Sequence, residues 1–360
     1  MRKLRIAILS DGASLGVPPY ICFLRRRGHD IHWITFTPPT KSYGAAMHDV
    51  SGSTKPLGPR WMKWRYVLYV PKIRKILREV RPDLLHAFYA TSGGILSVLS
   101  GFRPYIISVL GSDLITSVNS LLWKRIVRTT LARSALVHTV SDQLADLARE
   151  LGIPSDKIWV MTQGVDTELF SYQPRKELTP PIRILCIRSL REVYDPFTVV
   201  RACKILKNRG FEFALTFAAR GLREQEVRAL VSSLGLEPCV EFLGGYDIED
   251  LPKLLHHHDI YLSASHWDGT SLSLLEAMAG GIFPIVSRIT GNLAWVKDND
   301  TALMFEAGDA DGLADAVIRV VDNPSLRMAA VEKNRALIER RGAREENMMA
   351  LEQRYYQLLG

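Results

Sequence analysis

The sequence of 360 residues lacks the features that mark several special classes of protein. It contains no low-complexity tract and no run of 18 apolar residues that could form a membrane-spanning helix. The opening residues, MRKLRIAILSDG, hold too short an apolar run for a signal peptide and predict a first strand instead. The chain has only four cysteines, none spaced as CxxC, so we expect core thiols in a reducing compartment rather than disulfides or metal ligands. These absences predict a cytoplasmic globular protein.

The length and the composition predict two domains of ordinary size. With 47% hydrophobic and 23% charged residues, the chain can bury two separate cores. Apolar strand-like runs alternate with helical patterns along the chain, which is typical of α/β folds with parallel sheets. The polar, proline-rich residues 171–181 form the best candidate for a linker. We therefore expect an N-terminal domain over 1–170, a C-terminal domain over 182–344, and a last helix over 345–360.

Basic residues outnumber acidic ones by 46 to 38, which gives a net charge of +8 and favours polyanionic partners. Residues 60–81 mix Trp and Tyr with Lys and Arg, a pattern typical of a surface on an anionic bilayer. The alternative is a solvated helix face whose aromatic side chains pack into the core. Because nothing else in the chain resembles a nucleic-acid-binding fold, we expect no nucleic-acid partner. The predicted surface for a membrane or acceptor consists of Trp61, Lys63, Trp64, Arg65, Lys72, Arg74 and Lys75.

Residues 259–295 predict a strand, a loop, a helix, a second strand and a second loop. In such a unit a ligand binds beyond the carboxyl end of the strand, where the helix start offers free N–H groups to an anion. The expected helix begins near Ser271, after a loop that contains Gly269. Glu276 then lies more than one turn inside the helix. An alternative keeps Glu276 structural, because Ser273-Leu-Leu-Glu276 fits a capping box if the helix begins late.

Two further places predict contacts with a ligand. Arg188 stands at the end of a predicted strand over 182–187, where its planar fork suits diphosphate oxygens and where a buried Arg is costly without a partner. The loop after the first strand contains Gly12 and Gly16, which would allow close approach of a ligand. An ordinary strand-to-helix turn explains these two glycines almost equally well.

One segment of the chain carries a family resemblance. Asp268 and Glu276, spaced as Asp-x7-Glu and followed by Ala-Met-Ala, Gly281 and Pro284, closely resemble the E-x7-E segment of retaining glycosyltransferases of the GT-B fold, family 4. Here Asp replaces the first Glu. The resemblance implies an α/β fold of two Rossmann-like, doubly wound domains facing a central cleft. It also implies that the acceptor binds the N-terminal domain, that a nucleotide sugar binds the C-terminal domain, and that the last helix packs back on the N-terminal domain.

The resemblance also implies roles for individual residues. Glu276 takes the ribose hydroxyls, and Asp268 takes hydroxyls of the sugar. Where the family has Lys six residues after the Arg, this chain has Tyr194, so either Arg191 or Tyr194 is expected to supply the second phosphate contact. Where the family often has a His, this chain has Leu110, and Asp113 remains as a polar group of the cleft. The predicted catalytic residues are Arg188, Asp268, Glu276 and Asp113, and the predicted donor-binding residues are Gly12, Gly16, Arg188, Arg191, Tyr194, Gly245, Tyr246, Asp268, Gly269, Thr270, Ser271, Leu272 and Glu276.

The function implied is transfer of a sugar, with retention of configuration, from a UDP- or GDP-sugar to an acceptor hydroxyl. The basic and aromatic stretch favours a lipid or lipid-linked acceptor and a peripheral position at the inner face of the membrane. A soluble sugar or polysaccharide acceptor, or a nucleotide-sugar-binding protein without activity, are the alternatives. No Asp-x-Asp motif occurs, and three consecutive histidines at 256–258 cannot share one helical face, so no metal is expected. We expect a monomer.

Overall fold

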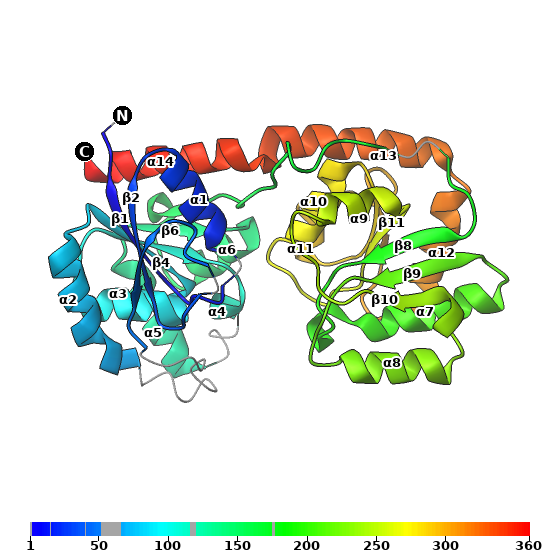
Figure 1. Ribbon diagram of the computed structural model, residues 1–360, viewed down its shortest axis with the longest axis horizontal. Coiled ribbons are helices and arrows are strands. Elements are labelled where there is room, and N and C mark those ends of the chain that lie inside the picture. The colour runs from blue at the N-terminus through cyan, green and yellow to red at the C-terminus, as the bar shows by residue number, and fades with distance from the viewer. Residues whose placement is uncertain (1, 15, 40, 52–65, 116–119, 175–176) are drawn as a thin grey trace. The chain divides into compact units, whose positions relative to one another are not determined.

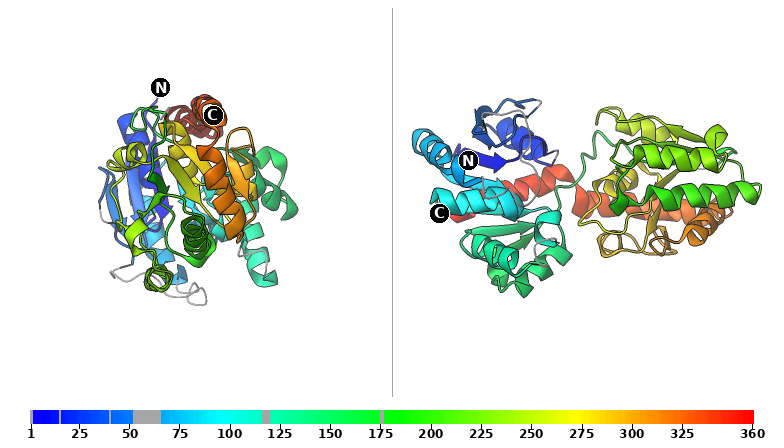
Figure 2. Two further views of the ribbon diagram at one scale, coloured as in Figure 1. Left: turned by 90° about the vertical axis from the view of Figure 1, so that its right-hand side faces the viewer. Right: turned by 90° about the horizontal axis from the view of Figure 1, so that it is seen from below.

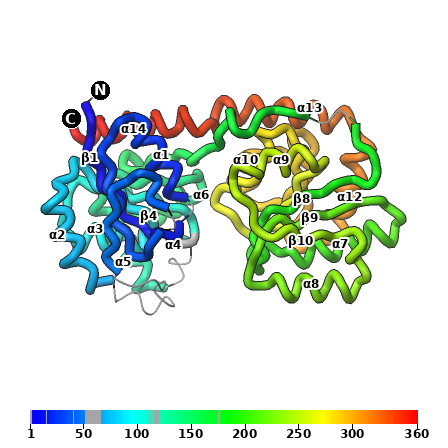
Figure 3. Tube along the Cα trace, viewed as in Figure 1, coloured from blue at the N-terminus to red at the C-terminus, as the bar shows by residue number. Residues whose placement is uncertain are grey.

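The computed structural model describes residues 2–14, 16–39, 41–51, 66–115, 120–174 and 177–360. The chain folds into two compact units (Figure 1). The first unit comprises residues 1–163 and 345–360, and the second comprises residues 164–344. The trace in Figure 3 follows the chain from the first unit into the second and back into the first.

The first unit is built on a seven-stranded sheet with the order β3-β2-β1-β4-β5-β6-β7. All its strand pairs are parallel, and the central strands are buried on both faces because helices cover both. The chain order reverses between β1 and β4, which is the switch point of a doubly wound sheet. The strands are β1 (Arg5–Ser10), β2 (Asp30–Thr35), β3 (Ala46–Asp49), β4 (Leu84–Phe88), β5 (Tyr105–Val109), β6 (Leu136–Thr139) and β7 (Ile158–Val160).

Two layers of helices enclose this sheet, as Figures 1 and 2 show. One apolar core lies under α1 and the last helix, and a second core lies under α2, α3, α5 and α6 on the other face. The short α4 lies in the loop after β5. The helices are α1 (Pro18–Arg26), α2 (Val70–Val80), α3 (Ile95–Ser100), α4 (Ser112–Ile115), α5 (Leu121–Ala132), α6 (Asp142–Glu150) and α14 (Arg344–Leu359). In the described part of the chain, no helix has both the length and the hydropathy to cross a membrane.

Buried polar contacts attach α14 to the first unit. The Glu352 carboxylate, only 4% exposed, accepts hydrogen bonds from Arg27 at 2.9 Å and from His29 Nε2 at 2.8 Å. The Leu4 amide donates to the other ring nitrogen of His29, so the imidazole hydrogen is free to face Glu352. Tyr355 lies on the same buried side of α14, and its hydroxyl is 2.5 Å from His86 Nδ1 in β4. The helix is therefore held by satisfied polar groups as well as by apolar packing.

The second unit is built on a six-stranded parallel sheet with the order β10-β9-β8-β11-β12-β13. The switch point lies between β8 and β11, so the loops that follow these two strands lie side by side at the carboxyl edge. The strands are β8 (Ile182–Cys186), β9 (Phe213–Phe217), β10 (Val240–Phe242), β11 (Ile260–Ser263), β12 (Phe283–Ser287) and β13 (Leu303–Phe305). The helices are α7 (Pro196–Asn208), α8 (Glu224–Ser233), α9 (Leu251–His257), α10 (Leu272–Gly280), α11 (Thr290–Leu293), α12 (Ala310–Val321) and α13 (Pro324–Leu337).

The predicted fold class, two Rossmann-like doubly wound α/β domains, is confirmed. One boundary differs from its prediction. Residues 164–170 were expected in the first domain but belong to the second unit. Val165 and Phe170 are fully buried in a core of that unit, and the backbone of Val165 pairs with that of Ala343. Residues 164–170 therefore belong to the second unit because their apolar side chains pack in its core, ahead of the polar linker.

We predict that Glu352→Ala lowers the free energy of unfolding of the first unit by about 3 kcal/mol, because it leaves His29 and Arg27 without their shared buried carboxylate. Glu345 offers a matched control, since it lies on the same helix and pairs with Arg26 of α1, but is half exposed. Glu345→Ala should cost less than about 1 kcal/mol. Calorimetry of the two variants would contradict this account if they were equally destabilised.

Candidate functional site

The loop between β11 and α10 fixes the start of the helix. The Ser271 hydroxyl accepts the Leu274 amide at 3.4 Å, so Ser271 is the N-cap and α10 begins at Leu272. Glu276 then lies in the second turn. The alternative capping box would need Ser273 as the N-cap, and the structure rules it out. The amide groups of the first turn of α10 remain available to an anion, as predicted.

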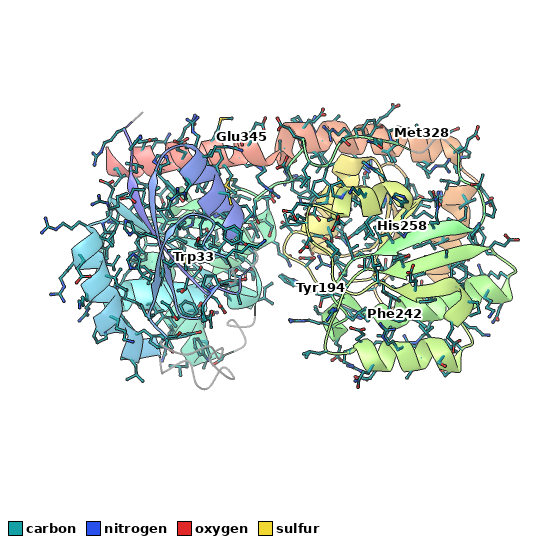
Figure 4. The ribbon with its side chains drawn as sticks, viewed as in Figure 1. Trp33, Tyr194, Phe242, His258, Met328 and Glu345 are labelled. Atoms are coloured by element: carbon teal, nitrogen blue, oxygen red, sulfur yellow. The ribbon has the colours of Figure 1, made fainter. Side chains whose placement is uncertain are left out.

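Arg188, which follows β8, meets the loop that follows β11. Its guanidinium forms an ion pair with the Asp268 carboxylate and donates to the hydroxyls of Ser271 at 3.3 Å and Ser273 at 3.2 Å. Both charged side chains are largely buried, with 13% and 14% exposed. The Tyr194 ring covers the guanidinium, whose carbon lies 4.1 Å from the ring centroid. Figure 4 labels Tyr194 among the side chains of the second unit. Residues predicted from two separate stretches of sequence therefore form one cluster: Arg188, Tyr194, Asp268 and Ser271.

The Asp268 carboxylate is itself surrounded by donors of the kind that bind phosphate. Besides Arg188, the amides of Gly269 and Thr270 and the hydroxyl of Ser271 approach it. Burial raises the pKa of Asp268, and these donors oppose that rise. The groups that were predicted to hold a diphosphate thus hold an internal carboxylate in this structure.

Glu276 has a different environment. Its side chain is buried, and in the described part of the chain it has no hydrogen-bond partner. Burial raises the pKa of Glu276 to about 7, although the positive charges of Arg344 and Arg188 oppose this. The pKa of the nearby Tyr246 phenol is also raised, mainly by burial and to a smaller extent by the charge of Glu276. A buried carboxylate without a partner is costly in a folded protein, which makes Glu276 the strongest candidate for contact with ligand hydroxyls.

Other parts of the second unit complete the carboxyl edge. Gly245 and Tyr246 follow β10, and Arg220, which follows β9, lies beside them: a Cβ on Gly245 would be 4.0 Å from its Nε atom. Arg191 is exposed and makes no described contact with Arg188 or Asp268. Of the two predicted sources of a second phosphate contact, Tyr194 is therefore the one that the structure places in the cluster.

Several residues of this site were not predicted. The Tyr261 hydroxyl, on β11, bonds to Ser273 at 2.8 Å and extends the network around Arg188 into the sheet. Two glycines pack closely against the loops after β8 and β11, which we call the two ligand loops. A Cβ on Gly221 would lie 2.2 Å from the backbone oxygen of Leu190, and a Cβ on Gly291 would lie 2.3 Å from the backbone oxygen of Asp268. Gly221 lies in a turn that the sequence indicates, but no local pattern marks Gly291, because its contact, Asp268, lies in another loop.

Two predicted residues of the first unit have structural roles. Both Asp113 oxygens accept backbone amides, from Ala90 at 2.7 Å and Gly111 at 3.0 Å, so this carboxylate holds the loops after β4 and β5 together. Burial raises the pKa of Asp113, opposed by these amides. Gly12 was expected to admit a ligand, but a Cβ there would lie 2.1 Å from the Thr37 oxygen, so the next loop fills that space. Gly16 differs, since a Cβ would meet only Leu110, at 3.7 Å.

The predicted basic surface is only partly described. Trp61, Lys63, Trp64 and Arg65 lie outside the described residues. The apolar stripe of α2 faces the core instead of the solvent, because Val70, Ile73, Leu77 and Val80 are buried. The remaining three side chains are exposed: Lys72 donates to the Val50 carbonyl at 3.2 Å, Arg74 donates to the Leu99 carbonyl at 2.7 Å, and Lys75 is 3.9 Å from Glu79. The helix itself therefore cannot lie on a membrane with that stripe.

The three consecutive histidines each bond to a backbone carbonyl, and His256 bonds to that of Ser171 at 3.1 Å. His257 and His258 each bond to a carbonyl one turn earlier, at 2.7 Å. Within the described residues no three His, Cys, Asp or Glu side chains gather as a metal site would require.

Two family models match the chain: "Glycosyltransferase Family 4" over residues 21–169 and "Glycosyl transferases group 1" over residues 171–337. The chain is 29% identical over 195 residues to the amylovoran biosynthesis glycosyltransferase AmsK of Erwinia amylovora, with 52% of this chain and 48% of that protein covered. It thus spans about half the length of that relative. It is 26% identical over 357 residues to the N-acetyl-alpha-D-glucosaminyl L-malate synthase of Bacillus anthracis, with 93% and 91% covered.

Among solved structures, HepE of Anabaena in complex with UDP and glucose superposes with a TM-score of 0.82. The comparison covers 98% of this chain and 100% of that chain, at 16% sequence identity. At this identity the likeness concerns the fold alone.

We predict that Glu276→Gln stabilises the second unit at pH 8. The folded-state pKa of Glu276 is raised, so its contribution to stability is fully present below its ordinary pKa near 4.5 and is lost as the pH rises through about 7. Gln cannot ionise, so the variant should gain roughly 3 kcal/mol of unfolding free energy at pH 8 and less than about 1 kcal/mol at pH 5. Melting temperatures at the two pH values measure the difference. An equal gain at both would show that ionisation is not the cause.

Proposed function

We propose, on the premise that the chain belongs to the group 1 family of glycosyltransferases, that it moves a sugar from a nucleotide diphosphate sugar to an acceptor hydroxyl with retention of configuration. The observation that carries the proposal is the pairing of a fixed cation with a partnerless buried carboxylate at the carboxyl edge of the second sheet. Arg188 supplies the cation and Glu276 the carboxylate.

The donor fits this edge in one orientation. The diphosphate takes the Arg188 fork and the amides at the start of α10, where the helix dipole favours negative charge. Glu276, one turn deeper, accepts hydrogen bonds from the ribose hydroxyls, and its charged form is the better acceptor. The base then extends toward Gly245 and Tyr246. HepE was solved with UDP, so uridine is the first base to test, and a GDP-sugar is the alternative.

Donor binding exchanges one anion for another. Arg188 and the amides that now hold Asp268 turn to the diphosphate, and the Asp268 carboxylate is released to the hydroxyls of the sugar. In the reaction the bond between the anomeric carbon and the phosphate oxygen breaks as the acceptor oxygen attacks from the same face. The acceptor proton passes to the departing phosphate, whose charge Arg188 stabilises. No nucleophile from the protein is needed, and we propose that no metal is needed either.

Two classes of acceptor compete. A lipid-linked acceptor fits the excess of basic residues, and a soluble sugar or polysaccharide is the competing class. Leu110 and Tyr194 stand where the family often has His and Lys, which favours a second candidate, a nucleotide-sugar-binding protein without activity. Turnover separates the two: release of UDP from a UDP-sugar, with the anomeric configuration of the product read by proton NMR, requires the enzyme.

Titration with UDP tests the exchange of anions. Arg188→Ala should weaken binding by roughly 100-fold, because it removes a charged donor from the diphosphate. Asp268→Asn should tighten binding by about 10-fold, because it removes the competing internal charge, and should at the same time reduce sugar transfer by more than about 100-fold. This opposite movement of affinity and turnover distinguishes Asp268 from a simple binding residue.

Arg183 provides a matched control. It lies on β8, the strand that Arg188 follows, and pairs with the buried Asp259 at 3.0 Å, but it does so at the opposite end of the sheet. Arg183→Ala should lower stability and leave the affinity for UDP unchanged. If Asp268→Asn bound UDP more weakly than the natural protein, the proposed exchange would be wrong.

A further inference from the structure

Four large apolar side chains stand exposed at the starts of two helices in the first unit. Val67 and Leu68 come just before α2 and are 56% and 62% exposed, and Leu121 and Leu122 open α5 and are 80% and 67% exposed. Among the described residues of this unit, the next most exposed large apolar side chains reach only 36%. We call these four residues the tip surface.

The two pairs lie at the same edge of the sheet. Both α2 and α5 lead directly into parallel strands, β4 and β6, so both run against the strands and begin at the carboxyl edge. They lie on the same face, and α3 packs between them (Figure 1). The loops with Gly16 and Leu110 follow β1 and β5 at this same edge. The tip surface thus borders the part of the first unit where a doubly wound sheet binds its ligand.

Basic side chains surround the tip surface. On α5, Lys124, Arg125 and Arg128 are three, four and seven residues beyond Leu121 and therefore share its face, and all three are exposed. The helix contains no acidic residue. On α2, Lys72 and Lys75 are exposed in the first two turns, and Glu79 is the only acidic residue of that helix.

The core does not need the tip surface. On α5 the buried side chains are Val127, Thr130 and Leu131, which lie away from the stripe of Lys124 and Arg128. On α2 the apolar stripe is already used in packing, as described above. The four exposed side chains are therefore surplus to the fold, and two adjacent exposed leucines at a helix start call for an apolar partner.

We propose that the tip surface docks on an anionic lipid bilayer. The apolar pairs enter the interface, and the lysines and arginines meet lipid phosphates around them. A polyanion without an apolar phase would leave the leucines in water. The proposal rests on the proposed function in one respect: it assigns the acceptor to the lipid class, because docking brings lipid headgroups to the carboxyl edge. It also places the membrane contact at the starts of α2 and α5.

Sedimentation with vesicles tests the proposal. The natural chain should bind vesicles of phosphatidylcholine mixed with phosphatidylglycerol and should bind pure phosphatidylcholine far more weakly. Leu121→Ser with Leu122→Ser should reduce binding by more than about 10-fold. Lys124→Gln and Arg125→Gln should each reduce it by about five-fold, and added salt should weaken the natural chain in the same way. Leu222→Ser, at a side chain 87% exposed in the second unit, is the control and should change nothing.

Three results would overturn the proposal. The first is no binding to anionic vesicles, and the second is vesicle binding that the double substitution Leu121→Ser with Leu122→Ser leaves unchanged. The third is a dimer, detected by light scattering, that the same double substitution abolishes. The last would make a second copy of the chain the partner. UDP affinity should be unchanged in every variant of the tip surface, because the substituted residues belong to the first unit and the proposed donor site belongs to the second. Loss of UDP binding in the natural chain with vesicle binding intact would contradict the proposed donor site and leave the docking surface standing.

Discussion

The ion pair between Arg188 and Asp268 is the interaction on which the candidate site depends. It joins the loops after β8 and β11, which are distant in the chain but adjacent at the switch point of the second sheet. Two largely buried charges add little net stability to a fold, since the cost of removing them from water offsets their attraction. Their position at the end of buried strands is instead the arrangement that a ligand requires. Glu276 adds to this cost, because its carboxylate is buried without a partner.

The surrounding structure holds these charged groups in place by backbone packing. Gly221 and Gly291 let neighbouring turns press against the two ligand loops, and Ser271 fixes the first turn of α10. The hydroxyls of Ser273 and Tyr261 carry the network down to β11. Such support keeps these side chains close to one geometry, which is the condition that the proposed stabilisation of a departing diphosphate requires.

The first unit uses its polar residues differently. Asp113 accepts hydrogen bonds from backbone amides and so holds two loops together. Glu352 binds His29 and Arg27, and Tyr355 bonds to His86, so these buried groups attach α14. The buried polar groups named here therefore have partners within the first unit. The charges suited to the chemistry lie in the second unit.

Much of this structure follows from local patterns in the sequence. Apolar runs predicted the parallel strands. The loop that contains Gly269 predicted a start of α10 near Ser271, which places Glu276 more than one turn inside the helix. Patterns could not show which face of an amphipathic helix a neighbour covers, so the sequence left open whether residues 60–81 meet a membrane or pack in part into the core. The apolar stripe of α2 packs in the core. They also could not show that Thr37 fills the space beside Gly12, or that Gly291 supports Asp268, because these contacts join segments far apart in the chain. Nor could they show that Asp113 accepts the amide of Ala90, which lies in another loop.

The most direct test of the central claim compares the affinities for UDP and UMP by calorimetry in the natural chain, Arg188→Ala and Glu276→Ala. If Arg188 holds the second phosphate and Glu276 holds the ribose, UDP should bind much more tightly than UMP in the natural chain. Arg188→Ala should abolish most of that difference, whereas Glu276→Ala should weaken both nucleotides and preserve it. A UDP preference that survives in Arg188→Ala would contradict the account, because the diphosphate would then lie elsewhere.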